Sequence, residues 1–330
     1  MNRRIAILIC FGLSVGFTVP ASAQDGSRSI VQRVTAKAGE LNREGLHYAK
    51  DQKYEAAINT FNQAIALQPN FTFAHYNLGL VLIKLHRFAE AVDQFHIVIA
   101  LTPDYSEAYA NLGNALINEG DNDAAINVLQ KAVELNPKLS NAYNDLGAAR
   151  FNLKQYSAAL DDFKQAEDLS PNDANVEFNL AITLMRLEQY ADAFSLYQKV
   201  VRLQPGWATA QEGLGDAAVL TQHFGHAVKA YLNVTKLQRD QGETFAKLGF
   251  VYGKLRRYRE AAEALERAVE LKPDDSTAHF NLGVVYSYLQ ERRSAAGQVK
   301  LLLSIDLKMA TELFDQIHSD KVLIIRHSKP

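Results

Sequence analysis

The chain has 330 residues, of which 48% are hydrophobic and 22% are charged, and its formal net charge is −2. This is an ordinary soluble composition, and the chain is long enough to bury a large core. No long run of Lys or Arg is present, so neither nucleic acid nor an anionic membrane is indicated as a partner. The single cysteine, Cys10, excludes a disulfide framework.

The first 23 residues have the pattern of a secretion signal. Two arginines precede an uncharged apolar run from residue 5 to 19, and Ala21-Ser22-Ala23 follows as a small-residue cleavage site. The run is shorter than the roughly 20 residues that a membrane-spanning helix needs. We therefore expect cleavage after Ala23, a periplasmic or secreted protein, and no stable membrane span in the mature chain.

A period of 34 residues governs the chain from residue 38 to 309. Proline stands at positions 69, 103, 137, 171, 205 and 273 on this grid. The grid defines eight blocks: 38–71, 72–105, 106–139, 140–173, 174–207, 208–241, 242–275 and 276–309. A lead segment, 24–37, precedes the blocks, and a capping segment and tail, 310–330, follow them. Apolar residues between 306 and 317 predict that the cap is a helix.

The same positions, or slots, of each block hold the same kind of residue. Slot 20 is alanine in all eight blocks, slot 8 is glycine in seven and slot 7 is leucine in seven, while slot 24 is always bulky and apolar. Apolar residues also recur at helical spacing in each half of a block. Two antiparallel helices per block are therefore predicted, with small residues where the helices approach closely and large ones beside them.

These slots resemble the tetratricopeptide repeat, whose pattern is W-x₂-L-G-x₂-Y…A-x₃-F…P over 34 residues. The resemblance covers all eight blocks. It implies an all-α fold, a right-handed superhelical solenoid of about eight helix-turn-helix units with a C-terminal capping helix. It also implies a protein-binding role.

No catalytic constellation accompanies the repeat. The sequence has no GxSxG, P-loop, HExxH or zinc-type cysteine pair. His223 and His226 stand near a turn, but a metal site needs further ligands, and a polar turn is the favoured interpretation. His75 and His279 occupy slot 4, where packing is the favoured role. We expect no enzyme activity, no cofactor and no metal.

Slots 2, 5, 6, 9, 12 and 13 form the stripe of the first helix that is predicted to line the concave side of the solenoid; we call this stripe the inner face. Slot 6 is asparagine in four blocks, and an amide can offer a donor and an acceptor to a peptide backbone. Similar asparagine ladders occur in the repeats of O-linked N-acetylglucosamine transferases. The predicted peptide-binding residues are Asn77, Asn111, Asn179, Asn281, Phe73, Tyr76, Phe178, Met185, Lys247 and Phe250.

The favoured hypothesis is an exported scaffold that binds a peptide segment of a cell-envelope protein along the inner face. One alternative is an accessory subunit of an envelope enzyme or a glycan-binding module, which would need a polar pocket such as one around His223 and His226. Another is self-association, with the C-terminal helix or tail docking on a neighbouring copy.

Overall fold

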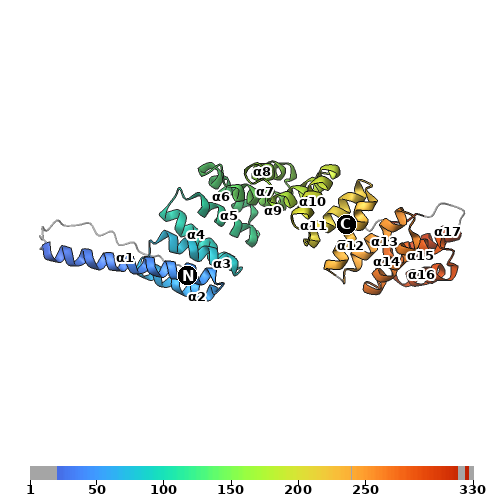
Figure 1. The fold of residues 1–330 in the computed structure, drawn as a ribbon, viewed down its shortest axis with the longest axis horizontal. Helices are drawn as coiled ribbons and strands as arrows, with labels where there is room; N and C mark the ends of the chain where they lie inside the picture. Colours follow the sequence, from blue (N-terminus) through green and yellow to red (C-terminus); the bar gives the residue numbers. More distant parts are fainter. Residues whose placement is uncertain (1–20, 239, 319–323, 327–330) are drawn as a thin grey trace, which may run out of the picture. The chain divides into compact units, whose positions relative to one another are not determined.

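The computed structural model describes residues 21–238, 240–318 and 324–326. Residues 1–20, which hold most of the predicted secretion signal, lie outside this range, as do most residues of the predicted tail. Every regular element within the described residues is an α-helix, in the order shown in Figure 1. None of these helices is both long and apolar enough to cross a membrane.

Each block contributes two helices and the turn between them. The first helices are the second half of α1 (Ala21–Lys50), α3 (Thr72–Lys84), α5 (Ser106–Glu119), α7 (Ser140–Asn152), α9 (Ala174–Arg186), α11 (Ala208–Leu220), α13 (Gly242–Lys254) and α15 (Ser276–Tyr288). The second helices are α2 (Tyr54–Leu67), α4 (Phe88–Leu101), α6 (Asn122–Leu135), α8 (Tyr156–Leu169), α10 (Tyr190–Leu203), α12 (Phe224–Leu237), α14 (Tyr258–Leu271) and α16 (Arg292–Ile305). The predicted all-α class is confirmed.

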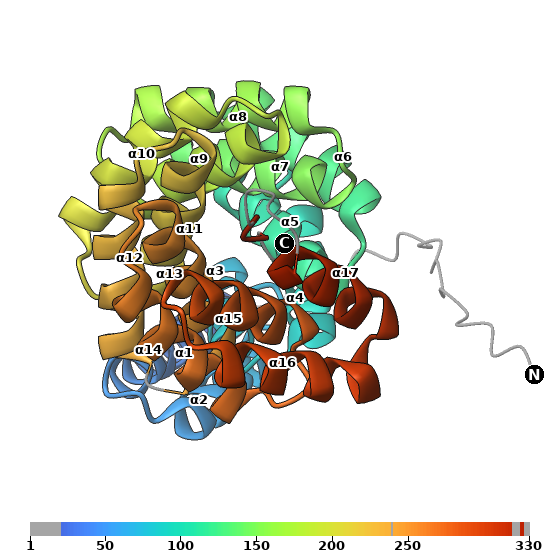
Figure 2. The same ribbon diagram turned by 90° about the vertical axis from the view of Figure 1, so that its right-hand side faces the viewer.

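The chain divides into two compact units, one up to residue 115 and one from residue 116 onward. In the first unit, α2 packs against α1 and α3, and α3 packs against α4. In the second unit, each helix from α6 to α17 packs against the next one along the chain. Figure 2 shows α9, α11, α13 and α15 of this unit along one side, with α10, α12 and α14 along the other.

Small residues hold the two helices of a block together, as predicted. The slot-20 alanines are fully buried, from Ala57 at 0% exposed to Ala295 at 1%. Five slot-8 glycines, Gly45, Gly79, Gly147, Gly215 and Gly249, face the large side chain of slot 24 in their own block. A Cβ added to Gly147 would lie 2.7 Å from the Phe163 ring, and one added to Gly79 would lie 2.8 Å from the Phe95 ring. Both distances are too short, so only glycine lets these helices approach so closely.

The turn inside each block has a backbone conformation that the sequence did not indicate. Residue 15 of every block has a positive φ, at Gln52, His86, Gly120, Lys154, Glu188, Gln222, Arg256 and Gln290. A left-handed conformation is easy for glycine and costs other residues free energy. Seven blocks nevertheless use a side chain there, and only Gly120 is the residue that the geometry favours.

The predicted capping helix is confirmed as α17 (Leu307–His318). It packs against α15 and α16, and its Leu313 is fully buried against Gly283 of α15. Leu307 on the same helix is 66% exposed. The helix therefore covers the last repeat with an apolar face and turns a second face to solvent.

Candidate functional site

The slot-6 asparagines make a recurring hydrogen bond between neighbouring repeats. The Nδ2 group of Asn77 donates to Asn42 Oδ1 at 3.0 Å, and that of Asn179 donates to Asn144 Oδ1 at 2.9 Å. Asn111 donates in the same way to the Tyr76 hydroxyl at 3.0 Å. In each pair the acceptor stands 35 residues earlier, in slot 5 of the preceding block. We call each such slot-6 to slot-5 pair a rung.

Lys247 forms a charged version of the rung. It occupies slot 6 of its block, and its ammonium group donates to Glu212 Oε1 in slot 5 of the preceding block at 2.8 Å. Two further carboxylates lie near the same ammonium group: Asp216 Oδ2 is 3.2 Å and Glu243 Oε1 is 3.6 Å from Lys247 Nζ. Burial lowers the pKa of Lys247, but the neighbouring carboxylates outweigh burial and raise it overall. The side chain is only 6% exposed, so this predicted peptide-binding cation is committed to the chain's own carboxylates.

Asn281 forms no rung, because slot 5 of the preceding block offers it no hydrogen-bond acceptor. The slot-5 residue before it is Ala246, which offers no side-chain oxygen. Asn281 instead donates from Nδ2 to the backbone oxygen of Arg326 at 2.7 Å, and its Oδ1 accepts from the Arg326 backbone N–H at 2.7 Å. One amide side chain thus holds both backbone groups of a residue in the C-terminal tail. This is the contact predicted for a peptide ligand, made here to the chain itself.

The predicted aromatic residues of the inner face form pairs with the loops between blocks. The Tyr76 and Tyr105 rings lie 4.9 Å apart, and the Phe178 and Trp207 rings lie 4.3 Å apart. Burial raises the pKa of Tyr76 to about 12, so its hydroxyl stays protonated while it accepts from Asn111. Phe73, by contrast, is 59% exposed.

An apolar cleft lies on the inner face between α7 and α9. Its volume is about 130 Å³, and it is lined by Ala148, Phe151, Asn152, Phe163, Asn179 and Ile182. Asn179 is the only one of the ten predicted binding residues in this lining. Its rung to Asn144 uses one amide hydrogen, and within the described residues no hydrogen bond is recorded for its Oδ1. The cleft therefore combines apolar walls with an amide acceptor, as an extended peptide requires.

The remaining predicted residues lie apart from this cleft or are covered. Met185 is half-buried on α9, while Phe250 is buried on α13 beneath Lys254, whose ammonium group lies 5.3 Å from the ring centre. The predicted set is therefore distributed along the inner face rather than gathered at one point. Its role in binding a peptide stays a prediction.

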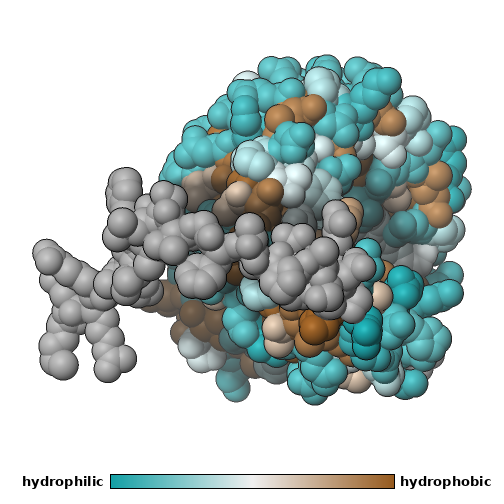
Figure 3. Space-filling model, turned by 90° about the vertical axis from the view of Figure 1, so that its left-hand side faces the viewer, coloured by the Kyte–Doolittle hydropathy of each residue, from teal (hydrophilic) through white to brown (hydrophobic). Residues whose placement is uncertain are grey.

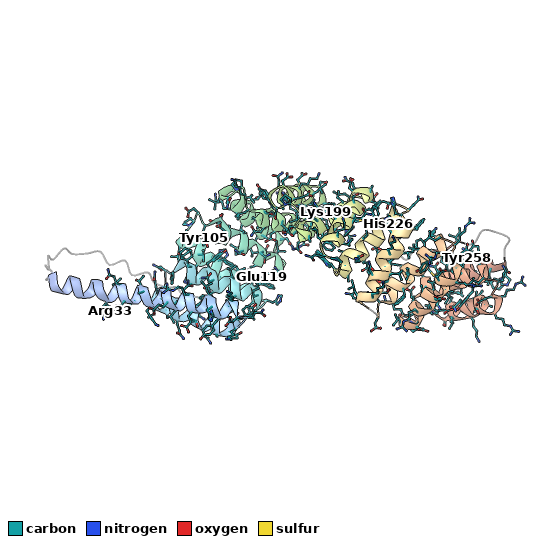
Figure 4. All side chains as sticks on the ribbon, in the orientation of Figure 1. Arg33, Tyr105, Glu119, Lys199, His226 and Tyr258 are labelled. Carbon is teal, nitrogen blue, oxygen red and sulfur yellow. The ribbon has the colours of Figure 1, made fainter. Side chains whose placement is uncertain are left out.

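The histidines have structural partners. His75 contacts the backbone oxygen of Pro69 through Nε2 at 2.9 Å, and His279 contacts that of Pro273 at 3.0 Å. The His223 ring stacks on Phe194 with centroids 4.7 Å apart. His226, which is labelled in Figure 4, stands edge-on to the same ring. No group of three metal-ligating side chains occurs among the residues that the structure describes.

Buried charges away from the inner face are paired across helices. Asp162 of α8 accepts from the Arg150 guanidinium of α7 at 2.7 Å. Burial raises the pKa of Asp162 to about 6, although Arg150 acts in the opposite direction. Glu177 of α9 is fully buried and pairs with Lys199 of α10, labelled in Figure 4. Burial raises the pKa of Glu177, and the bond from Lys199 opposes this.

A second apolar hollow lies at the start of the first unit. It is lined by Ile30, Val31, Val34, Thr35, Leu67, Gln68, Pro69 and Asn70. Ile30 and Val31 are 60% and 64% exposed. Figure 3, which faces the end of the molecule at the left of Figure 1, shows hydrophobic patches within a mostly hydrophilic surface. The sequence did not single out these residues, because a lone exposed apolar side chain is common.

Family models of repeat proteins match three stretches of the chain. A tetratricopeptide repeat model matches residues 45–86 and 257–289, and the model of the tetratricopeptide repeat protein 21 C-terminal ARM domain matches residues 106–214. A search of curated protein sequences finds no match.

Solved structures share the fold at low sequence identity. YrrB, described as a TPR protein with an unusual peptide-binding site, is 23% identical, with a TM-score of 0.53 over 56% of this chain and 95% of YrrB. PilF of Pseudomonas aeruginosa is 19% identical, with a TM-score of 0.57 over 62% and 94%. The C-terminal part of a TPR protein of Cytophaga hutchinsonii is 18% identical, with a TM-score of 0.58 over 73% and 98%.

Proposed function

We propose that this chain, whose repeats match tetratricopeptide repeat models in part, is a non-enzymatic scaffold that binds an extended segment of a protein partner along its inner face. The observation that carries the proposal is the cleft between α7 and α9, where apolar walls surround Asn179. A peptide there would bury an aliphatic or aromatic side chain between Phe151 and Ile182. Its backbone N–H would donate to Asn179 Oδ1.

The expected affinity is modest. Each hydrogen bond that replaces water contributes about 0.5–1.5 kcal/mol, and ordering a flexible peptide removes part of that gain. Three of the four slot-6 asparagines already donate one amide hydrogen to a rung, so that hydrogen is not available to a peptide. Micromolar, exchangeable binding is therefore proposed, with apolar contacts in the cleft supplying the selectivity.

We also propose that the partner is a protein of the cell envelope. The support comes from the apolar run and the small-residue cleavage site within residues 1–23. N-terminal sequencing of the protein recovered from its native envelope fraction should begin at Gln24. A protein that retains residues 1–23 and stays in the cytoplasm contradicts this part of the proposal.

The cleft is tested by changing its wall without touching a rung. Ile182→Asp puts a charge into the cleft, and the matched control Gln165→Arg changes the charge at an exposed site on α8. The full chain and both variants are crosslinked to partners in envelope extract, and hydrogen exchange is measured on the recovered complexes. We expect a captured protein that protects α7 and α9, that the control retains and that Ile182→Asp loses. Equal capture by all three chains contradicts the proposal.

A further inference from the structure

Residues 324–326 of the C-terminal tail lie on the inner face of the last two repeats, and each of the three makes a different contact. The backbone N–H of Ile324 donates to Gln316 Oε1 of α17 at 3.1 Å. Ile325 is 8% exposed and belongs to the core of the second unit. Arg326 has both of its backbone groups bound by Asn281, at 2.7 Å each.

Ile325 of the tail packs against α13 at Gly253, where the lack of a side chain leaves room for it. A Cβ added to Gly253 would overlap Ile325 Cδ1, and its other near neighbours are also atoms of Ile325. Gly253 occupies slot 12, which is not one of the helix-crossing slots. The slot-12 residues of the eight blocks are Ala49, Ile83, Ile117, Phe151, Met185, Val219, Gly253 and Ser287. Glycine therefore stands at this slot only in the block where the isoleucine docks.

The arginine side chain is recognised as well as its backbone. The Arg326 guanidinium lies 4.6 Å from the centre of the Phe280 ring, in slot 5 of the last block. Its Nη2 lies 2.6 Å from Glu312 Oε2 on α17. A ring face and a carboxylate together favour a planar cation. These contacts suit an aliphatic residue followed directly by arginine.

The absence of a rung leaves Asn281 available for this contact. The other rung donors in the second unit, Asn179 and Lys247, meet oxygen acceptors in slot 5 of the preceding block. Ala246 stands at that position before Asn281. Ala246, Gly253 and the ring of Phe280 thus meet around one tail segment, and the glycine is the one of the three whose residue type occurs at its slot in no other block.

We propose that Gly253, Phe280, Asn281 and Glu312 form a peptide subsite for an aliphatic-arginine pair on a partner protein, and that the chain's own tail occupies this subsite in cis as a competitor. The proposal rests on the proposed scaffold function and adds the sequence class of the ligand and its regulation. A tethered segment acts at an effective concentration in the millimolar range, so it competes strongly with a free peptide of micromolar affinity. A partner gains access when the tail is displaced.

The test follows binding of a fluorescent peptide with the sequence of residues 321–330, KVLIIRHSKP, to the full-length chain. Ile325→Asp in the chain should release the tail and tighten binding of the free peptide at least about tenfold relative to wild type. Adding Gly253→Ala or Asn281→Ala to that variant should return binding to the wild-type level or weaker. Peptides with Asp in place of the second isoleucine, or Glu in place of arginine, should not bind.

A matched glycine controls for effects on folding. Gly297 is also inside a helix, α16, and a Cβ added there would meet nothing within 4 Å. Gly297→Ala combined with Ile325→Asp should bind the peptide as Ile325→Asp alone does, with circular dichroism unchanged in all variants. Equal peptide binding by wild type and Ile325→Asp overturns the proposal, as does full binding after Gly253→Ala.

Two further outcomes are distinguishable. A wild-type chain that is dimeric in light scattering and becomes monomeric with Ile325→Asp overturns the cis assignment in favour of a second copy. If the peptide-binding test fails but partner capture still depends on Ile182, only the present inference is overturned. Failure of both removes the scaffold proposal too.

Discussion

At the residue scale, the Asp162–Arg150 pair makes stability depend on pH in an uncommon direction. Burial raises the pKa of Asp162 to about 6, above the value of about 4 that aspartate has in an unfolded chain. Between these two pH values the folded state holds a proton that the unfolded state has lost. The contribution of Asp162 to the free energy of unfolding therefore falls as pH rises through this window, and it is constant at higher pH.

Asp162→Asn should remove this dependence. Relative to wild type, the variant should gain up to about 3 kcal/mol in free energy of unfolding between pH 4 and pH 7, measured by urea unfolding at both values. Asp161→Asn, at the exposed neighbouring position, is the matched control and should follow the wild-type profile. A profile of Asp162→Asn that runs parallel to that of wild type contradicts the assignment.

The slot-6 asparagine shows how far a single residue can be interpreted from sequence. Helical spacing places Asn77 on a different face of α3 from the packing residues Leu78 and Gly79. Both packing residues are buried, whereas Asn77 is partly exposed. Its hydrogen-bond partner could not be predicted, because Asn42 is 35 residues away and the pairing depends on how adjacent first helices align. A search for polar pairs at spacing 35 would have found Asn77 with Asn42 and Asn179 with Asn144.

At the scale of the element, the turn between the two helices of a block carries conformational strain. Lys154 has a φ of 61° between α7 and α8. The sequence could not indicate this, because Gln, His, Lys, Glu and Arg at slot 15 share no turn preference. The helices themselves were predictable, since Gly, Ala and Pro recur at fixed slots and act through local sterics.

Lys154→Gly should therefore stabilise the protein. Relief of the left-handed conformation should raise the free energy of unfolding by about 0.5–1 kcal/mol, even after the greater freedom of glycine in the unfolded chain. The control is Lys164→Gly on the exposed side of α8, where glycine should cost about 1 kcal/mol. Urea denaturation gives both values, and destabilisation by both substitutions contradicts the prediction.

At the scale of the whole molecule, stability comes from contacts between neighbours in the chain. Within each of the two units, helices pack against their neighbours along the chain, so a defect should spread over a short range only. The all-helical repeat and the capping helix could be predicted because every block repeats the same signals. The position of the tail could not, because one short apolar segment at the end of a chain has many surfaces to choose from.

Leu313→Ala tests this locality. Loss of a fully buried leucine should cost about 2–4 kcal/mol in the last repeat. Hydrogen exchange should rise in α15, α16 and α17, while α2, α3 and α4 keep the protection of wild type. Leu307→Ala on the exposed side of the same helix should change neither region. Uniform loss of protection along the chain would show that the repeats unfold as one unit.

The rungs have a consequence for how such an array can change by duplication. Block two carries both halves of a rung, with Tyr76 as acceptor and Asn77 as donor, and it is bonded on both sides. Tandem copies of this block would carry matching junctions without any new mutation. Block eight has the donor Asn281 but presents Phe280 where a following block would need an oxygen. Duplication of block two thus preserves the rungs, whereas a block added after the eighth would begin without one.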